Sequence, residues 1–498
     1  MYGVLLVGAL AITQESAAVD WSALARADIE AAHREISESH PGPVDPLAPD
    51  FGERMDAIRD RALAFADRAE TAMGYRAALL SYGAGYSDNH LGILVGIEPE
   101  RHRWPGFVVA RAIDGRTRIV RTSEAQGGLF GAEILECEGR DLDALMRERV
   151  FAFRGVEARE VDWMRRAALL FLHEGNPFAP PIETCLFRLA DGREADIELS
   201  WRAIEHDAWQ AELAASQGGG ETLSSGMRSF GEGRYWINLP NFNPDQDARL
   251  ALRALIDSIA EQADELRSAD VIVFDLRQNG GGSSAWGREI ALLLWGRAYL
   301  NQQNGQLSAV DWRASSANAD HLEALVPRIQ ADGYASVADH FQDVADEMRV
   351  GLTHGEALVR FQSGTLVRPV PADGRVVVPD MIEAVAEEVR IENPVQAQVL
   401  FLSAGSSCAS ACLDFADNVL ATDTASLVGW MTGADSLYME LREIVLPSQH
   451  ARLGLPTKVY RGRSRGSMEA YQPEILYTGD DFSTETLQEW IEREILGD

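Results

Sequence analysis

The N-terminal part of the chain has the apolar spacing of amphipathic helices. Apolar side chains recur about every 3.6 residues in two series, which are Leu24, Ala27, Ile29, Ala32 and Ile36, then Met55, Ile58, Leu63 and Ala66. The run P-G-P-V-D-P at 41–46 separates the two series. The pattern predicts a helical hairpin or small bundle within residues 19–100. Gly83 and Gly85 are expected to end its last helix. The segment Y-S-D-N-H follows them and precedes an apolar strand.

Residues 103–205 change to short apolar runs that are typical of strands. Runs such as F-V-V-A-R-A and A-E-I-L-E-C are separated by D-G pairs, which favour hairpin turns. A helical stretch at 141–172 interrupts them. We expect a β domain over 101–215, followed by a Gly-rich linker at 217–222. Its order of a strand, G-A-E-I-L-E-C-E-G-R-D and a helix resembles the carboxylate-loop region of a PDZ domain.

Beyond the linker, strands alternate with helices. The strands are continuous apolar, β-branched runs, as in buried parallel sheets, at 235–239, 270–276 and 399–403. Amphipathic helical patterns lie at 249–266 and 285–294. This alternation predicts an α/β domain over 225–498, with an acidic, largely helical insert at about 305–395. The fold class is therefore a multidomain α/β (α+β) protein.

Charge and composition narrow the classes of function. The chain has 498 residues, 77 acidic and 45 basic, with a net charge of -32. Such an acidic balance argues against a nucleic-acid or anionic-membrane partner, since both need a basic face. Of the basic residues, only Lys458 is a lysine. Any mechanism with a lysine base would therefore have to use Lys458.

The N-terminus and the cysteines bear on the compartment. Residues 2–12 are apolar but too few to span a bilayer, and S-A-A precedes Val19. We interpret residues 1–18 as a signal peptide, which implies a periplasmic or secreted protein. The four cysteines do not form a C-x-x-C zinc pattern. Cys408 and Cys412 are interpreted as small core residues, with a disulfide between them as the less favoured alternative, and the pairing of Cys137 with Cys185 stays open.

A glycine-rich turn follows one buried strand. The run D-L-R-Q-N-G-G-G, Asp275 to Gly282, lies between the strand and the next helix. Backbone N–H groups at such a turn suit an anion or a developing oxyanion, although a tight turn alone would look the same. It is neither a Walker loop nor a dinucleotide-binding fingerprint. Asp275 and Arg277 are expected to pair structurally, and Asn279 to brace the turn.

Two further segments contain a candidate nucleophile and a candidate general base. The run A-G-S-S-C-A-S-A-C-L-D-F-A-D, 404–417, places small residues between a strand and a helix. Four serines, Ser403, Ser406, Ser407 and Ser410, compete there for the role of nucleophile, and each could instead be a helix cap. His90, in Y-S-D-N-H-L-G-I, is a candidate general base, but a lone histidine is more often structural.

Together the three segments resemble the C-terminal processing (tail-specific) serine peptidases. That family has a D-x-H element ahead of a PDZ-like domain, then D-L-R-x-N-x-G-G, then S-A-x-x-x-F-A, and the chain holds these elements in that order. The resemblance implies a crotonase/ClpP-like α/β catalytic domain, no cofactor or metal, and a protein or peptide substrate. It implies Ser410 as nucleophile. Leu413 replaces the family's usual Glu.

The resemblance also separates two mechanisms. The Ser-Lys branch of the family has a lysine about 25 residues after the serine, and Asp435 occupies that position here. The Ser-His branch, which includes the tricorn core, implies His90 as base and Glu469 as an orienting carboxylate. The backbone N–H groups of Ala411 and of Gly281 or Gly280 would form the oxyanion hole.

Two other functions remain open. The first is a catalytically lapsed member that binds a peptide or hydrophobic ligand, favoured by Leu413 and the missing lysine. The second is a crotonase-like acyl enzyme, which a PDZ-like domain between base and glycine turn argues against. Neither the oligomeric state nor the peptide specificity follows from the sequence.

Overall fold

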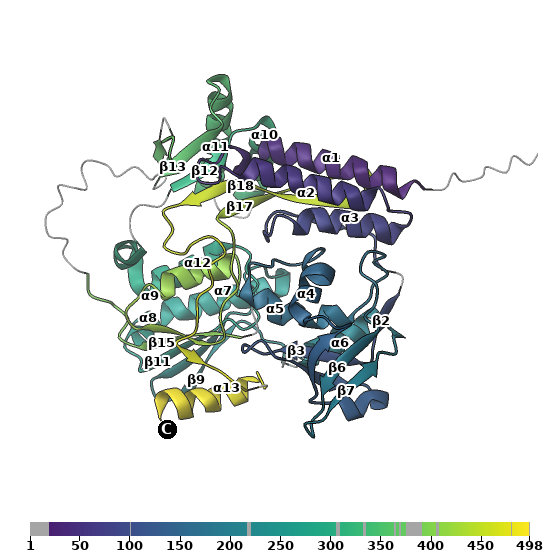
Figure 1. Ribbon diagram of the computed structural model, residues 1–498. Coiled ribbons are helices and arrows are strands. Elements are labelled where there is room, and N and C mark those ends of the chain that lie inside the picture. Colours follow the sequence, from purple (N-terminus) through teal and green to yellow (C-terminus); the bar gives the residue numbers. More distant parts are fainter. Residues whose placement is uncertain are drawn as a thin grey trace, which may run out of the picture.

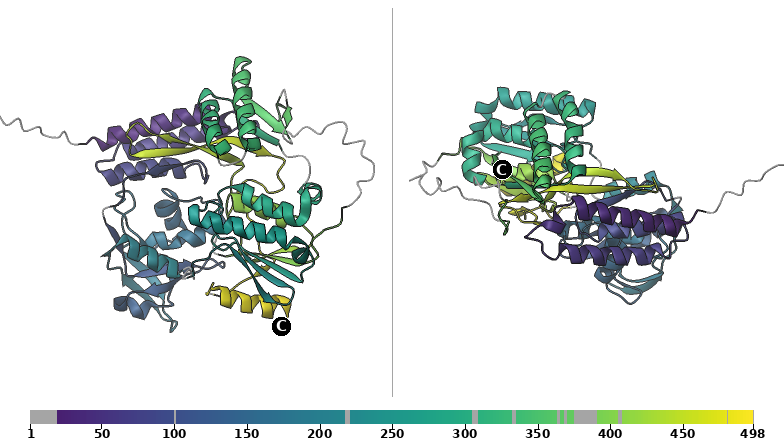
Figure 2. Two further views of the ribbon diagram at one scale, coloured as in Figure 1. Left: turned by 180° about the vertical axis from the view of Figure 1, so that it is seen from behind. Right: turned by 90° about the horizontal axis from the view of Figure 1, so that it is seen from above.

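The chain folds into three connected parts, seen in a computed structural model (Figures 1 and 2). The structure describes residues 19–99, 101–216, 221–304, 309–331, 335–362, 365–367, 370–374, 391–404, 408–479 and 481–497. The expected signal peptide, 1–18, lies outside the described residues. None of the helices within these ranges has both the length and the apolar character needed to cross a bilayer.

The N-terminal helices form as their apolar spacing predicts. They are α1 (Trp21–Ser39), η1 (Gly42–Val44), α2 (Phe51–Ala66) and α3 (Ala72–Ala84). Asp20 caps α1 by accepting the Ala23 N–H at 2.9 Å, and Thr71 caps α3 through the Gly74 N–H at 3.1 Å. The spaced apolar residues Ile29, Ala32 and Ile36 of α1 face inward and are fully buried. The predicted helical hairpin or bundle is confirmed.

The three helices cover one sheet, which we call the outer sheet. Its strands are β1 (Gly92–Val95), β12 (Ala309–Arg313), β13 (Leu358–Gln362), β14 (Thr365–Val367), β17 (Tyr438–Val445) and β18 (Ala451–Arg461). Their order is β1-β18-β12-β13-β14, and β17 also pairs with β18. Helices α10 (Ser316–Ala331) and α11 (Ala335–Thr353) pack on β12 and β13. The sheet therefore joins the N-terminal region, the insert and the C-terminal part of the chain.

Residues 101–216 form a separate β-module with its own core. Its main sheet has the antiparallel order β3-β4-β5-β6-β7, and β2 pairs with β8. The strands are β2 (His102–Trp104), β3 (Phe107–Arg111), β4 (Thr117–Thr122), β5 (Glu133–Cys137), β6 (Thr184–Arg188), β7 (Glu194–Glu198) and β8 (Arg202–Ile204). The helices and turns are η2 (Glu124–Leu129), α4 (Leu142–Leu145), η3 (Met146–Phe151), α5 (Glu160–Arg166), η4 (Ala167–Phe171) and α6 (His206–Ser216).

The helix expected over 141–172 is broken into short pieces. Gly155 adopts a positive φ of 78° between η3 and α5, a conformation outside the helical region. A Cβ at Gly155 would lie 2.3 Å from the Arg166 Nε. A local backbone break of this kind interrupts a pattern that otherwise has helical periodicity.

The third part is built on a second sheet, the central sheet. Its order is β19-β16-β15-β11-β10-β9, parallel throughout except for β9 at the edge. The strands are β9 (Gly226–Gly231), β10 (Arg234–Asn238), β11 (Val271–Asp275), β15 (Gln398–Ser403), β16 (Ala425–Gly429) and β19 (Ile475–Leu476). Its helices are α7 (Gln246–Glu261), α8 (Ala263–Arg267), α9 (Ser284–Asn304), α12 (Ala411–Val419), α13 (Thr484–Ile491) and η5 (Glu492–Leu496).

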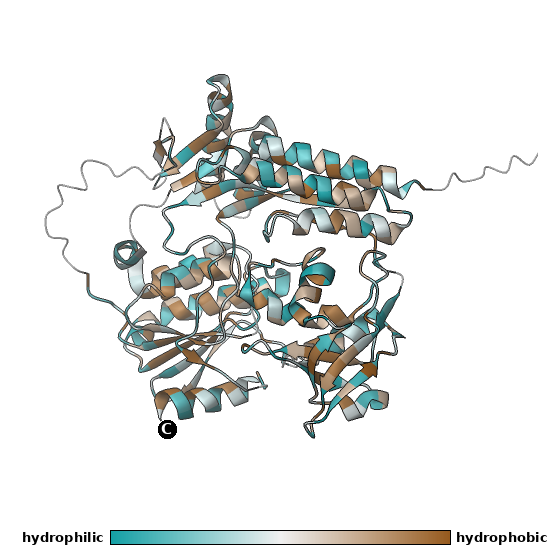
Figure 3. Cartoon of the chain, in the orientation of Figure 1, coloured by the Kyte–Doolittle hydropathy of each residue, from teal (hydrophilic) through white to brown (hydrophobic). Residues whose placement is uncertain are grey.

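Both faces of the central sheet are covered, which explains its continuous apolar strands. In β11, Ile272 and Phe274 join the core beneath α7, α9 and α12, while Val271 and Val273 join the core beneath α13. Side chains alternate between the two faces of a strand, so a strand covered on both sides is apolar throughout. Figure 3 shows the hydrophobic strands between the helices on either side. The predicted mixed helix-and-sheet, multidomain fold is confirmed.

A buried chain of ion pairs fixes the outer sheet to the N-terminal segment. Arg461 on β18 donates to Asp45 at 2.7 Å and to Asp311 on β12 at 2.8 Å. Arg360 on β13 donates to the same Asp311 at 2.5 and 2.8 Å. All four side chains are buried. Each charge depends on its partner, because a buried ion without one is strongly unfavourable.

Cys408 and Cys412 are buried, as expected of small core residues, and they also form a disulfide, the less favoured alternative. The bond joins Cys408, which precedes α12, to Cys412 in its first turn. Cys137 and Cys185, whose pairing the sequence left open, form a second disulfide between β5 and β6. The i,i+4 spacing resembles one face of a helix. In the structure, however, Cys408 precedes the helix, where the chain turns back toward Cys412.

Replacing Arg461 tests the buried ion chain. Arg461→Met leaves the Asp45 and Asp311 carboxylates short of a partner, so we expect the free energy of unfolding to fall by about 3–5 kcal/mol. Urea denaturation measures it. The matched control is Arg193→Met, which removes an exposed pair with Asp191 and should cost less than about 1 kcal/mol. Equal losses in the two variants would contradict a structural role for the buried chain.

Candidate active site

Ser410 lies at a strained turn between the central sheet and a helix. It follows β15, directly precedes α12, and has φ 53° and ψ -122°. Such a conformation costs a residue with a side chain about 1–3 kcal/mol and is characteristic of functional sites. Its side chain is half-buried and does not cap the helix. Of the competing serines, Ser403 is buried in β15, and Ser406 and Ser407 lie outside the described residues.

The glycine turn packs directly against Ser410. Gly281 has φ 98°, and a Cβ there would lie 2.5 Å from the Ala409 carbonyl oxygen and 2.7 Å from the Ser410 Cβ. Asn279 braces the turn as predicted, donating to the Leu239 carbonyl at 2.8 Å and accepting the Gly281 N–H at 3.0 Å. Only glycine allows this close approach of the two backbones.

The N–H groups that are expected to form the oxyanion hole differ in whether they already donate a hydrogen bond. The Gly281 N–H is already donated to Asn279. Over the described ranges, the N–H groups of Gly280 and Ala411 have no acceptor. Ala411 is also the first residue of α12, where the helix dipole favours negative charge. An anion beside Ser410 would therefore find unused donors in both elements.

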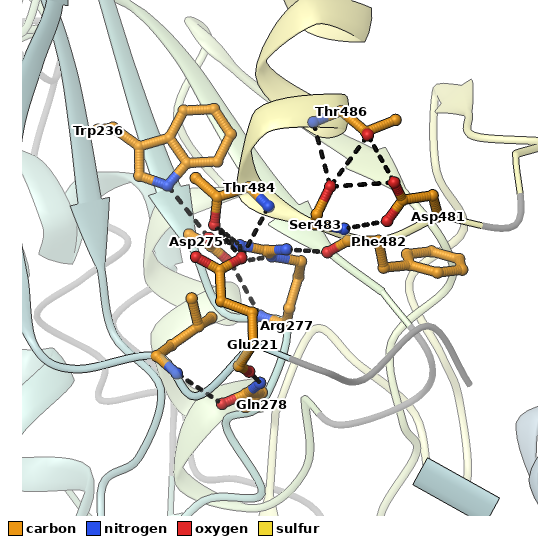
Figure 4. A network of polar contacts seen from close by, with 11 residues as sticks. Glu221, Trp236, Asp275, Arg277, Gln278, Asp481, Phe482, Ser483, Thr484 and Thr486 are labelled. Atoms are coloured by element: carbon orange, nitrogen blue, oxygen red, sulfur yellow. Dashed lines mark hydrogen bonds and ion pairs between the residues drawn. The ribbon is translucent and has the colours of Figure 1, made fainter. Parts of the chain in front are cut away.

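Arg277 secures the base of the glycine turn (Figure 4). Its guanidinium donates to both Asp275 oxygens, at 2.8 and 2.6 Å, which confirms the predicted structural pair. It also donates to the Thr484 hydroxyl at 2.6 Å and to the Phe482 carbonyl, at the start of α13. Glu221 accepts the Thr484 N–H at 2.8 Å. The C-terminal helix is thereby fixed to the turn that contacts Ser410.

Asp435, which stands at the lysine position of the Ser-Lys pattern, lies at the centre of the site. It is 1% exposed, in the loop between β16 and β17. Its Oδ2 accepts the Ser410 N–H, and its Oδ1 accepts the Asn89 side-chain N–H at 2.9 Å. Its carbonyl accepts the Met468 N–H at 2.8 Å. The loops that carry Ser410, His90 and Glu469 therefore meet at one residue.

The β-module reaches the same point through Arg159. Its guanidinium donates to the Asn89 Oδ1 at 2.8 Å, and Arg159 is 5% exposed. Asp162, one turn along α5, lies 3.4 Å from the guanidinium. Because Arg159 is charged and buried, it holds the Asn89 side chain firmly. A sequence signal for this contact is absent, because the two residues are distant along the chain.

His90 is placed near this cluster but is not joined to Ser410. Asn89, its neighbour, contacts Asp435, and the His90 N–H donates to Asp88 at 2.8 Å. Its ring Nδ1 is 4.0 Å from the Asp88 carboxylate and is buried with no hydrogen-bond partner in the described part of the chain. Burial raises the pKa of Asp88, and the charge of Asp435 adds to this rise against the opposing effect of His90.

Glu469 is not brought into contact with Ser410 or His90. Its carboxylate accepts the Gly466 N–H at 2.6 Å, and the side chain is exposed. Its neighbour Met468 nevertheless contacts Asp435, so the Glu469 loop lies beside the cluster. Within the described residues, no group of three or more His, Cys, Asp or Glu side chains is arranged to hold a metal ion.

The Lys458 ammonium contacts side chains of the outer sheet. Its ammonium donates to Glu440 at 3.0 Å and lies over the Trp312 ring at 4.7 Å. Burial alone would lower the pKa of Lys458, but Tyr460 and Glu440 outweigh burial and raise it. A general base needs the opposite shift. Lys458 is therefore an ion-pair residue of the outer sheet.

Comparison with solved structures shows what the whole chain resembles. Its fold is similar to that of mature CPAF complexed with lactacystin, with a TM-score of 0.59 and 14% identity over 96% of this chain and 100% of that one. A second structure of mature CPAF gives a TM-score of 0.60 and 14% identity over 95% of this chain and 96% of that one. Likeness at this identity shows the fold.

Other comparisons add less. The photosystem II D1 C-terminal processing protease has a TM-score of 0.34 and 11% identity over 93% of this chain and 95% of that one, too low a score to support a conclusion. No protein-family model and no curated protein matches the chain.

Two glycine substitutions test the packing of the turn on Ser410. In Gly281→Ala the new Cβ meets backbone atoms at a positive φ, so we expect a loss of about 2 kcal/mol or more of unfolding free energy. Gly280→Ala meets nothing within 4 Å and should be close to neutral. Urea denaturation of both variants measures the difference. Equal stabilities would contradict the close approach.

Proposed function

We propose that this protein is a serine peptidase, an endopeptidase that hydrolyses protein or peptide substrates. The observation that carries the proposal is Ser410 itself, a strained serine at a strand-to-helix turn with a glycine turn packed against it. Serine nucleophiles occupy such turns because the turn exposes the hydroxyl above a sheet. The resemblance to C-terminal processing peptidases and the likeness to CPAF in fold support it.

The proposed reaction proceeds through an acyl-enzyme. The Ser410 Oγ attacks the scissile carbonyl carbon while His90 takes the hydroxyl proton. The tetrahedral intermediate collapses, the C–N bond breaks, and the protonated His90 gives its proton to the leaving amine. Water, deprotonated by His90, then attacks the ester and releases the acid and Ser410. His90 has no hydrogen bond to Ser410 here, and catalytic contacts often tighten only when substrate binds.

The negative charge that forms on the carbonyl oxygen needs donors. We assign the Ala411 N–H and one glycine N–H to this oxyanion hole, each worth about 3 kcal/mol. Of Gly280 and Gly281, Gly280 is favoured, since the Gly281 N–H is donated to Asn279. Glu469 would orient His90, directly or through water. In that case its carboxylate would have to leave the Gly466 N–H.

The proposal extends to domains and compartment. The β-module would be a PDZ-like domain that binds a peptide end or strand by β-augmentation. Residues 225–498, which carry the central sheet and most strands of the outer sheet, would be the crotonase/ClpP-like catalytic domain. We place the protein in the periplasm or outside the cell, and its two disulfides support an oxidising compartment.

A second candidate is a lapsed peptidase that binds a peptide or hydrophobic ligand. It is favoured by the missing His90–Ser410 contact and by the position of the Glu469 carboxylate. Reaction with an active-site probe separates the two functions, because fluorophosphonates label only activated serines.

Ser410→Ala tests the nucleophile. We expect the wild-type protein to cleave a casein substrate and to be labelled by a fluorophosphonate, and the variant to lose both. Ser406→Ala and Ser407→Ala should keep both. In-gel fluorescence and peptide release are the measurements. Labelling that survives in Ser410→Ala would refute the assignment, and an unlabelled wild type would favour the lapsed peptidase.

His90→Ala and Lys458→Ala distinguish the two possible bases. We expect kcat to fall at least about 100-fold in His90→Ala, because general-base catalysis contributes about 10²–10⁴-fold. Lys458→Ala should keep kcat within about threefold, since its ammonium is paired with Glu440 and supplies no base. Steady-state kinetics measure both. The reverse result would assign the role of base to Lys458 instead of His90.

A further inference from the structure

We propose that Asp435 is a positioning residue for Ser410, and that the carboxylate occupies the lysine position of the Ser-Lys branch without taking over the role of a base. Its two oxygens hold the nucleophile turn on one side and the loop of the base on the other. This role rests on the proposed peptidase function. It concerns where Ser410 sits, and the Asp435 side chain takes no part in proton transfer.

The contact with Ser410 is made to the main chain rather than to the hydroxyl. The Ser410 N–H donates to the Asp435 Oδ2, and within the described residues the Ser410 Oγ has no partner. The Ser410 N–H precedes the helical hydrogen bonds of α12 and points to the β16–β17 loop, where Asp435 accepts it. A buried acceptor is therefore needed at this point, because an unsatisfied N–H would destabilise the turn. The Oγ meanwhile stays free for attack.

The second contact is fixed by donor and acceptor chemistry. Arg159 only donates, so the Asn89 amide must face it with its oxygen, at 2.8 Å. The amide nitrogen then donates to the Asp435 Oδ1 at 2.9 Å and to the Ala434 carbonyl at 3.3 Å. Asp435 only accepts, and each of its oxygens receives one donor. The chain Arg159–Asn89–Asp435–Ser410 thus has a single arrangement in which every group is matched.

A lysine at this position would not serve the same purpose. An ammonium donates and does not accept, so it has nothing to offer the Ser410 N–H. It would also face the Asn89 nitrogen, another donor. Compared with the Ser-Lys pattern, Asp435 is the loss of a catalytic lysine. It is also the acceptor that the Ser410 N–H requires in the observed backbone conformation.

Each single substitution places two donors or two acceptors opposite each other in the hydrogen-bond chain Arg159–Asn89–Asp435–Ser410. In Asp435→Asn one carboxylate oxygen becomes an N–H₂ group, which faces either the Ser410 N–H or the Asn89 nitrogen. In Asn89→Asp two carboxylates face each other. We expect each variant to lower kcat about 10- to 100-fold with KM within about twofold, because a misplaced nucleophile costs catalysis more than binding. The main-chain carbonyl at position 435 still holds Met468 in both.

The swapped variant, Asn89→Asp with Asp435→Asn, restores the match. The new amide at position 435 accepts the Ser410 N–H with its oxygen, and its nitrogen donates to the new carboxylate at position 89. That carboxylate also accepts from Arg159, and the net charge equals that of the wild type. We expect the swap to recover at least about tenfold in kcat over the weaker single variant. A residue that acts only as a structural support would show coupling in thermal unfolding without this loss and recovery of kcat.

The experiment measures kcat, KM and the rate of fluorophosphonate labelling for the wild type, both single variants and the swap, with thermal unfolding to confirm folding. Slow singles and a rescued swap support the role. Singles as fast as the wild type, or a folded swap slower than both singles, overturn it while leaving the peptidase assignment intact. A wild-type protein that neither cleaves nor is labelled overturns the proposed function, and this role with it.

Discussion

The hydrogen bond from the Ser410 main chain to the buried Asp435 carboxylate is the constraint on which the site depends. It satisfies the N–H of the residue that precedes α12, and the free energy of such a charge-assisted bond, about 1.5–3 kcal/mol, is of the size of the strain itself. The other Asp435 contacts reach the His90 loop, the Glu469 loop and, through Asn89, the β-module. One buried carboxylate thereby aligns segments from all three parts of the molecule.

Local features of the chain are predictable because local physics determines them. The apolar spacing of α1 and α2, the buried strand β11 and the glycine turn all follow from neighbouring residues. The pairing of Asp275 with Arg277 and the brace from Asn279 are predictable for the same reason, since each partner is two residues away. These elements fix where Ser410 lies relative to the central sheet.

The contacts of Asp435, Asn89 and Arg159 cannot be predicted in this way. Each joins segments that are distant along the chain, and nothing in an isolated Asp, Asn or Arg reveals what it will face after folding. The sequence pattern shows only that position 435 lacks a lysine amine. That Asp435 instead supplies a buried hydrogen-bond acceptor can be recognised once the backbone conformation of Ser410 is known. The Cys408–Cys412 bond is hard to predict from the sequence. The i,i+4 spacing is that of two residues on one face of a helix, but α12 begins only at Ala411, after Cys408.

The pairing of β1 with β18 has a consequence for the order in which the protein is made. The strand β1 directly follows His90, and among the described strands it pairs only with β18, near the C-terminus. The ribosome therefore completes the serine turn, the glycine turn and Asp435 before the His90 loop gains its supporting strand. A nascent chain cannot hold the whole site together. The elements around Ser410 and the His90 loop can therefore be held together only after β18 has been synthesised.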